Sequence, residues 1–181
     1  MPRIKRDIAA GTFHVYTHCV WAVPYLFRDA TDRIEFLRHL ALVGAKTRWT
    51  CIGYCLMDSH YHLIVDVGDG LLPTAMHGLN LRYARHHNRR YGLRGHVQFE
   101  RYGCRRLGDD ADLLETFAYV ANNPVTAGLC TSPAEWRWSS YRGTIGLEAP
   151  SSFVDSARVL RCFPWPQTVP TTALRTYVEK R

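Results

Sequence analysis

The chain has 181 residues, of which 46% are hydrophobic and 22% are charged, a balance that indicates one globular domain and excludes a disordered segment. No apolar run reaches the length of a membrane span, and no apolar segment of a signal peptide follows the basic N-terminus, so we expect a cytoplasmic protein without a membrane partner. The six cysteines form no Cys-x-x-Cys pair, which favours reduced thiols over a disulfide framework or a structural zinc site.

The net charge of +7 is concentrated in residues 81–106, which contain eight arginines and one acid, Glu100, while the rest of the chain is balanced. Arginine suits bidentate contacts with phosphates, and the aromatic side chains between these arginines could stack on bases. The simpler alternative is a solvated basic helix and loop. We predict a nucleic-acid interface made by the arginines of this segment: Arg82, Arg85, Arg89, Arg90, Arg94, Arg101, Arg105 and Arg106.

The first predicted element follows a basic lead-in, residues 1–11. Residues 12–23 are rich in β-branched and aromatic side chains and predict a strand that ends before Pro24. Alternation places Phe13, Val15, Thr17 and Cys19 on one face and His14, Tyr16, His18 and Val20 on the other.

A helix is predicted over residues 29–46, capped by Asp29 or Thr31. Its expected apolar face consists of Ile34, Leu37, Leu40, Ala41 and Ala45. Two strands are then expected at residues 48–56 and 60–67, antiparallel to each other because a short break separates them.

A second helix is predicted over residues 73–91, with Met76, Leu79, Tyr83 and His87 along one face. Residues 97–104 predict a short strand or an extended loop. A third helix is expected from Asp109 or Asp110 to about Asn122.

The third helix places one tyrosine away from its packing face. Steps of 100° put Leu113, Leu114, Phe117, Val120 and Ala121 on one side. Tyr119 then lies almost opposite, and Asn123 lies one turn further on. Pro124 disfavours a helical conformation at Asn123.

Two tail helices are expected at residues 152–162 and 171–181, after an aromatic segment around Trp136 and Trp138 that we expect to pack on the core. The element order predicts an α+β fold, a small antiparallel sheet with helices on one face.

His60 and His62 lie two residues apart at the start of a predicted strand, so both side chains point to the same side of the sheet. Two imidazoles in this arrangement could share one cation if a third ligand came from elsewhere. They could equally be ordinary histidines at a strand end.

Four segments together resemble the single-tyrosine HUH transposases, most closely their REP-associated branch. The segments occur in the same order at residues 14–17, 56–63, 119–129 and 138–141. The resemblance covers roughly residues 12–145, which we expect to form a transposase-like catalytic domain followed by a helical tail, residues 146–181.

The resemblance implies a ferredoxin-like sheet and cleavage of single-stranded hairpin DNA by a monomer or homodimer. It makes Tyr119 the nucleophile and His60, His62 and Asn123 the ligands of Mg²⁺ or Mn²⁺. The sequence departs from the family at Asp58-Ser59, where proline-asparagine is usual, and at Tyr61, where the family has an aliphatic residue.

Two alternatives remain. A non-catalytic binder of hairpin DNA or RNA would use the arginines equally well, but it would not need His60, His62, Tyr119 and Asn123 together. A metal hydrolase would use the two histidines with water as the nucleophile, and its activity would not depend on Tyr119.

Overall fold

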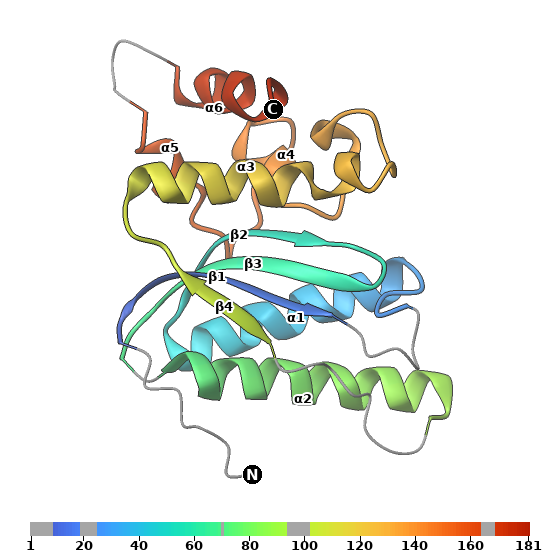
Figure 1. Ribbon diagram of the computed structural model, residues 1–181. Helices are drawn as coiled ribbons and strands as arrows, with labels where there is room; N and C mark the ends of the chain where they lie inside the picture. The colour runs from blue at the N-terminus through green and yellow to red at the C-terminus, as the bar shows by residue number, and fades with distance from the viewer. Residues whose placement is uncertain (1–8, 19–24, 70, 94–101, 164–168) are drawn as a thin grey trace.

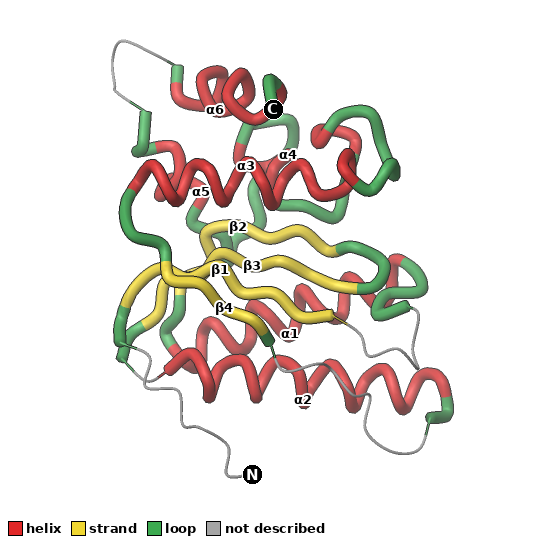
Figure 2. Tube along the Cα trace, in the orientation of Figure 1, coloured by secondary structure: helices red, strands yellow, loops and turns green. Residues whose placement is uncertain are grey.

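The computed structural model describes residues 9–18, 25–69, 71–93, 102–163 and 169–181. Figures 1 and 2 show a sheet between two helical layers. The strands are β1 (Gly11–His18), β2 (Thr50–Leu56), β3 (His60–Val67) and β4 (Gly103–Arg106). The helices are α1 (Ala30–Thr47), α2 (Leu71–Tyr91), α3 (Asp110–Thr126), α4 (Tyr141–Thr144), α5 (Ser156–Leu160) and α6 (Pro170–Glu179), with a 3₁₀ turn η1 (Pro133–Glu135).

The sheet has the strand order β2-β3-β1-β4, and every neighbouring pair is antiparallel. Together with the chain order β1-α1-β2-β3-α2-β4, this is the ferredoxin-like arrangement. The predicted α+β class and the antiparallel pairing of the second and third strands are confirmed.

One face of the sheet is covered by α1 and α2, which lie side by side beneath it in Figure 1. The face of α2 predicted from the sequence is buried there, including Leu79 and Tyr83. Tyr61 of β3 is fully buried in the same layer, and its hydroxyl donates to Asn80 Oδ1 at 2.6 Å. The tyrosine between the two histidines therefore packs into the core and points away from them.

The opposite face is covered by α3, so the prediction that helices lie on one face only needs correction. Phe117 of α3 packs with Ile52 of β2 and Ile64 of β3 in a second core cluster. Val159 of α5 and Val178 of α6 join this cluster, and α5 and α6 contact α3. The sheet thus lies between two layers, and α3 lies between the sheet and the C-terminal helices (Figure 1).

The predicted apolar face of α1 is largely wrong. Leu40 is buried, but Ile34 is 56% exposed. The buried face runs through Asp32, Arg33, Phe36, His39, Leu40 and Val43. It includes charged side chains because these are paired: Asp32 accepts hydrogen bonds from Arg90 and Tyr91, and Arg33 donates to Asp58. Apolar periodicity does not detect a face that buries an ionic network.

The third helix continues beyond its predicted end and includes Pro124 in its last turn. The ring of Pro124 is buried, and its carbonyl accepts a hydrogen bond from Leu129 N at 2.9 Å. Ala127 N also donates to Asn123 O at 2.9 Å. These contacts offset the local preference against helix before proline, so Asn123 keeps its helical position one turn after Tyr119.

The remaining boundaries differ modestly from prediction. β1 is described only to His18, because residues 19–24 lie outside the described part, as do residues 94–101 before β4. The tail helices are shorter than expected. Trp138 packs against the first core cluster as predicted. None of the five described cysteines forms a disulfide there, and no described helix has the length and apolar character needed to cross a membrane.

Candidate active site

An open pocket of about 950 Å³ lies between the sheet and α3. It collects side chains from β1, β3, β4 and α3, and Arg181 follows α6 at its rim. Its lining residues are His14, Tyr16, His60, His62, Arg105, Asp112, Glu115, Thr116, Ala118, Tyr119, Asn122, Asn123, Thr126 and Arg181. The pocket exists because β1 and β3 present alternating polar side chains to a helix whose own packing face lies further along the sheet.

His60 and His62 point into the pocket from β3, as strand alternation predicts. Their ring centroids are 5.1 Å apart. The His60 Nδ1 lies 3.1 Å from Ser59 Oγ, and the His62 Nδ1 lies 3.0 Å from His14 Nε2. A polar partner on Nδ1 fixes the orientation of each ring, so each histidine would bind a cation through Nε2.

His14 is the site residue to which the sequence assigned no role. It lies on the central strand β1, is only 8% exposed, and its ring stacks on His62 with centroids 5.2 Å apart. Burial, together with the nearby charge of Arg105, lowers the pKa of His14 to about 4. The ring is therefore neutral near pH 7 and can share a hydrogen bond with His62 without adding positive charge beside a cation.

The alternation of residues 12–18 does place His14 on the histidine face. The missing information was the register, which pairs His14 with Ile64 and Tyr16 with His62. Register depends on contacts far apart in the sequence and could not be derived from one strand.

α3 presents Tyr119 to the two histidines as the helical steps predicted. The side chain is 56% exposed. Its ring meets His62 edge-on at 5.6 Å between centroids and meets His14 edge-on at 5.9 Å. The phenol is thus both accessible to a large substrate and adjacent to the candidate cation ligands.

Asn123 lines the same pocket one turn after Tyr119. Its Nδ2 donates to the backbone carbonyl of Tyr119 at 2.8 Å. With the amide nitrogen engaged on the helix, the side-chain oxygen Oδ1 is the atom that could bind a cation.

Two imidazoles and an amide oxygen fit a divalent cation that accepts nitrogen and oxygen ligands. Within the described residues, no group of three or more His, Cys, Asp or Glu side chains is arranged to hold a metal ion. A site here therefore requires Asn123, or oxygens of the substrate, to complete the two histidines. Magnesium and manganese commonly take such oxygen ligands from substrate phosphates.

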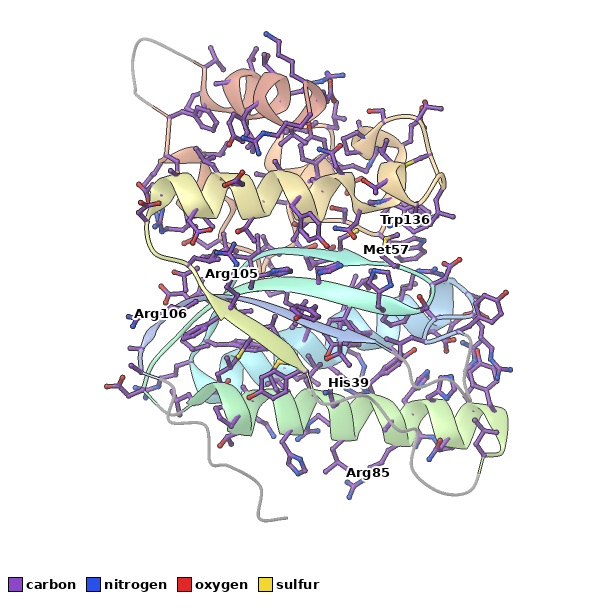
Figure 3. All side chains as sticks on the ribbon, viewed as in Figure 1. His39, Met57, Arg85, Arg105, Arg106 and Trp136 are labelled. Atoms are coloured by element: carbon purple, nitrogen blue, oxygen red, sulfur yellow. The ribbon has the colours of Figure 1, made fainter. Side chains whose placement is uncertain are left out.

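The predicted arginines do not gather at this pocket. Arg105 does line it, where it is held by Asp112 Oδ1 at 2.7 Å and Thr116 Oγ1 at 2.7 Å. Arg106 lies on the edge strand β4, and its Nη2 donates to Ala10 O at 2.9 Å. Figure 3 shows Arg105 close to α3 and Arg85 on the outer side of α2, across the sheet.

Three exposed arginines, Arg82, Arg85 and Arg89, follow one side of α2 at spacings of three and four residues. We refer to them as the α2 arginine stripe. Arg90 instead bonds to Asp29 and Asp32 and ties α2 to the start of α1. Arg94 and Arg101 lie outside the described residues. The basic segment therefore spans both faces of the sheet rather than one.

No family model matches the sequence, and no curated protein matches it. Among solved structures, the fold is similar to a REP-associated tyrosine transposase bound to a REP hairpin, with a TM-score of 0.64 and 17% identity over 80% of this chain and 86% of that one. A transposase candidate from Deinococcus radiodurans R1 aligns over 67% of this chain and 97% of its own, with 12% identity and a TM-score of 0.45. The resemblance predicted from the sequence is confirmed at the level of the fold.

Proposed function

We propose that this chain is a metal-dependent transposase that cleaves and rejoins single-stranded DNA next to hairpins through a covalent 5′-phosphotyrosine. The observation that supports this most directly is the position of Tyr119. Its accessible phenol lies edge-on to His62 and His14 in a pocket shared with His60 and Asn123.

Tyr119 supplies the nucleophile. Its hydroxyl loses a proton as the oxygen attacks the phosphorus of a phosphodiester, and the bond from phosphorus to the 3′-oxygen breaks. The products are a 5′-phosphotyrosine and a strand with a free 3′-hydroxyl. The new ester conserves the phosphodiester bond, so another 3′-hydroxyl can attack it and release Tyr119 without an external energy source.

His60, His62 and Asn123 are the residues that would hold Mg²⁺ or Mn²⁺. Such a cation offsets the negative charge that develops on the phosphate oxygens. His14 contributes by fixing the His62 ring through the 3.0 Å contact between its Nε2 and His62 Nδ1. Arg105, fixed by Asp112 and Thr116, places a positive charge beside the same pocket.

The α2 arginine stripe supports a second DNA contact on the opposite face of the sheet, suited to the backbone of a hairpin stem. The REP hairpin bound by the structurally similar transposase supports a hairpin as the substrate class. In this proposal residues 12–145 form the catalytic domain. The tail, residues 146–181, buttresses α3 through α5 and α6.

The experiment is a denaturing gel of the protein with labelled single-stranded hairpin DNA from the flanks of its gene, in Mn²⁺ or in EDTA. We expect label to co-migrate with protein only with Mn²⁺, and not with Tyr119→Phe. The matched control is Tyr91→Phe, which removes one phenol hydroxyl from the other side of the sheet, where it bonds Asp32. Adduct should persist in this control.

Two outcomes would contradict the proposal. Cleaved DNA without adduct, equally produced by Tyr119→Phe, would indicate a hydrolase that uses water. Hairpin DNA that binds but is never cut, for every flanking hairpin, would indicate a binding protein on this fold.

A further inference from the structure

We infer that a second, smaller pocket binds a guanine base of the DNA strand, one or two nucleotides from the phosphodiester that Tyr119 attacks. This pocket has a volume of about 340 Å³ and is lined by Tyr25, Phe27, Arg28 and Asp58. The inference rests on the proposed function for the identity of the strand. The pocket's own chemistry selects the base.

The pocket is built on the tip of the β2–β3 hairpin. Met57 N donates to His60 O at 2.9 Å and closes a tight turn whose two central residues are Asp58 and Ser59. The carbonyl of Asp58 accepts hydrogen bonds from Leu26 N at 2.8 Å and Phe27 N at 3.0 Å. The segment before α1 is thereby tied to the hairpin tip that carries His60.

The carboxylate of Asp58 is held in place from behind. It pairs with Arg33, whose side chain is only 7% exposed. The Arg33 guanidinium in turn lies 5.4 Å from the ring centre of Trp138 and 5.7 Å from that of Phe27. The Asp58 side chain remains 44% exposed, so a fixed acceptor faces the pocket.

The other walls supply a donor and a stacking surface. The guanidinium of Arg28 lies 4.0 Å from the ring centre of Tyr91, a cation–π contact that fixes its position. Tyr25 is 52% exposed and Phe27 is buried, so one aromatic ring is accessible beside an apolar floor. Exposed aromatic rings beside basic groups are typical places for a base of single-stranded nucleic acid to stack.

A carboxylate and a guanidinium in one pocket distinguish guanine from the other bases. Guanine offers two adjacent N–H donors at its Watson–Crick edge, which a carboxylate can accept. It also offers the O6 and N7 acceptors, which are the commonest partners of arginine. Adenine and cytosine present an amino donor but lack the paired donors, and thymine offers a single N–H donor between two carbonyl acceptors.

The location fixes which nucleotide is read. Asp58 precedes His60 by two residues, and two residues span at most about 7.6 Å of chain. A base in this pocket therefore belongs to a nucleotide close to the phosphate held beside His60. It would set where the strand is cut, separately from any recognition of the hairpin stem by the α2 arginine stripe.

The test measures the binding of fluorescent oligothymidylates with one central base varied, using Tyr119→Phe protein in EDTA so that no strand is cut. We expect guanine to bind about tenfold more tightly than thymine, adenine or cytosine, the range of one good bidentate pair. Inosine lacks the exocyclic amino group and should lose most of that preference. Asp58→Asn should remove the difference between guanine and inosine, and Tyr25→Leu should weaken all strands alike.

Thermal denaturation of each variant shows whether it is folded, and the comparison of guanine with inosine on the unaltered pocket needs no pocket variant. Equal affinity for all five strands, including no binding of any, would overturn the inference and leave the phosphotyrosine mechanism intact. Guanine preference in a protein that never forms an adduct would support the pocket and refute the proposed function.

Discussion

The hydrogen bond from His14 to His62 predicts that cation binding depends on a residue that need not touch the cation. Replacing His14 with Ala removes the partner of His62 Nδ1, 3.0 Å away, and frees the His62 ring to turn. Loss of such a partner typically lowers metal affinity by about 10–100-fold. Isothermal titration of the protein with Mn²⁺, without DNA, measures this directly.

The matched control is His39→Ala. His39 and His14 are both 8% exposed, but His39 lies on α1 at the other face of the sheet. Each substitution should cost roughly 1–3 kcal/mol of folding free energy, which lowers Tm by about 2–4 °C per kcal/mol in a chain of this size. Only His14→Ala should also weaken Mn²⁺ binding. Equal Mn²⁺ affinity in the two variants would refute the orienting role of His14.

Four further predictions follow from other parts of the structure. Asn123→Ala should weaken Mn²⁺ binding about tenfold or more, and Asn123→Gln, which keeps an amide oxygen, should restore part of it in the same titration. Burial disfavours the charged form of Asp32, but hydrogen bonds from Tyr91, the backbone N–H of Arg28 and Arg90 outweigh it and lower its pKa. The stability from ionised Asp32 is therefore present above its unfolded pKa and lost as pH falls through the folded one, so the difference in urea stability between wild type and Asp32→Asn should shrink on acidification; a constant difference would contradict this. Reversing the α2 arginine stripe to Glu should reduce the salt dependence of hairpin binding by up to about 0.9 in logarithmic slope per phosphate contact, as measured by anisotropy, and an unchanged slope would exclude the stripe from the interface. A Cβ on Gly103 would lie 2.2 Å from Tyr16 Cζ, so Gly103→Ala should cost about 1–3 kcal/mol, and adding Tyr16→Ala should recover Tm.

The sequence predicted those parts of the site that depend on local periodicity. Alternation put His60 and His62 on one side of β3, and helical steps put Tyr119 opposite the packing face of α3. The structure brings all of these, with Asn123, to one pocket. Each of these relations spans at most a few residues, so it is encoded where the residues themselves lie.

The parts that were missed depend on long-range contacts. The buried face of α1 was wrong because Asp32 and Arg33 find partners 26 or more positions away or on another element. The separation of the arginines onto two faces depends on where α2 and β4 lie relative to the sheet. His14 acquired its role only through the β1–β3 register.

The short connection between β4 and α3 has a consequence for how DNA strands would be exchanged. Only residues 107–109 join the two elements; Leu107 N is bonded to Thr12 O at 2.8 Å, and Gly108 N to Asp112 Oδ2 at 3.0 Å. α3 is also packed on both sides, by the sheet and by the C-terminal helices. The helix thus acts as a fixed anvil, and a DNA end attached to Tyr119 would stay beside the histidines of its own chain. Rejoining to a new partner would require the incoming strand to travel, with the protein holding still.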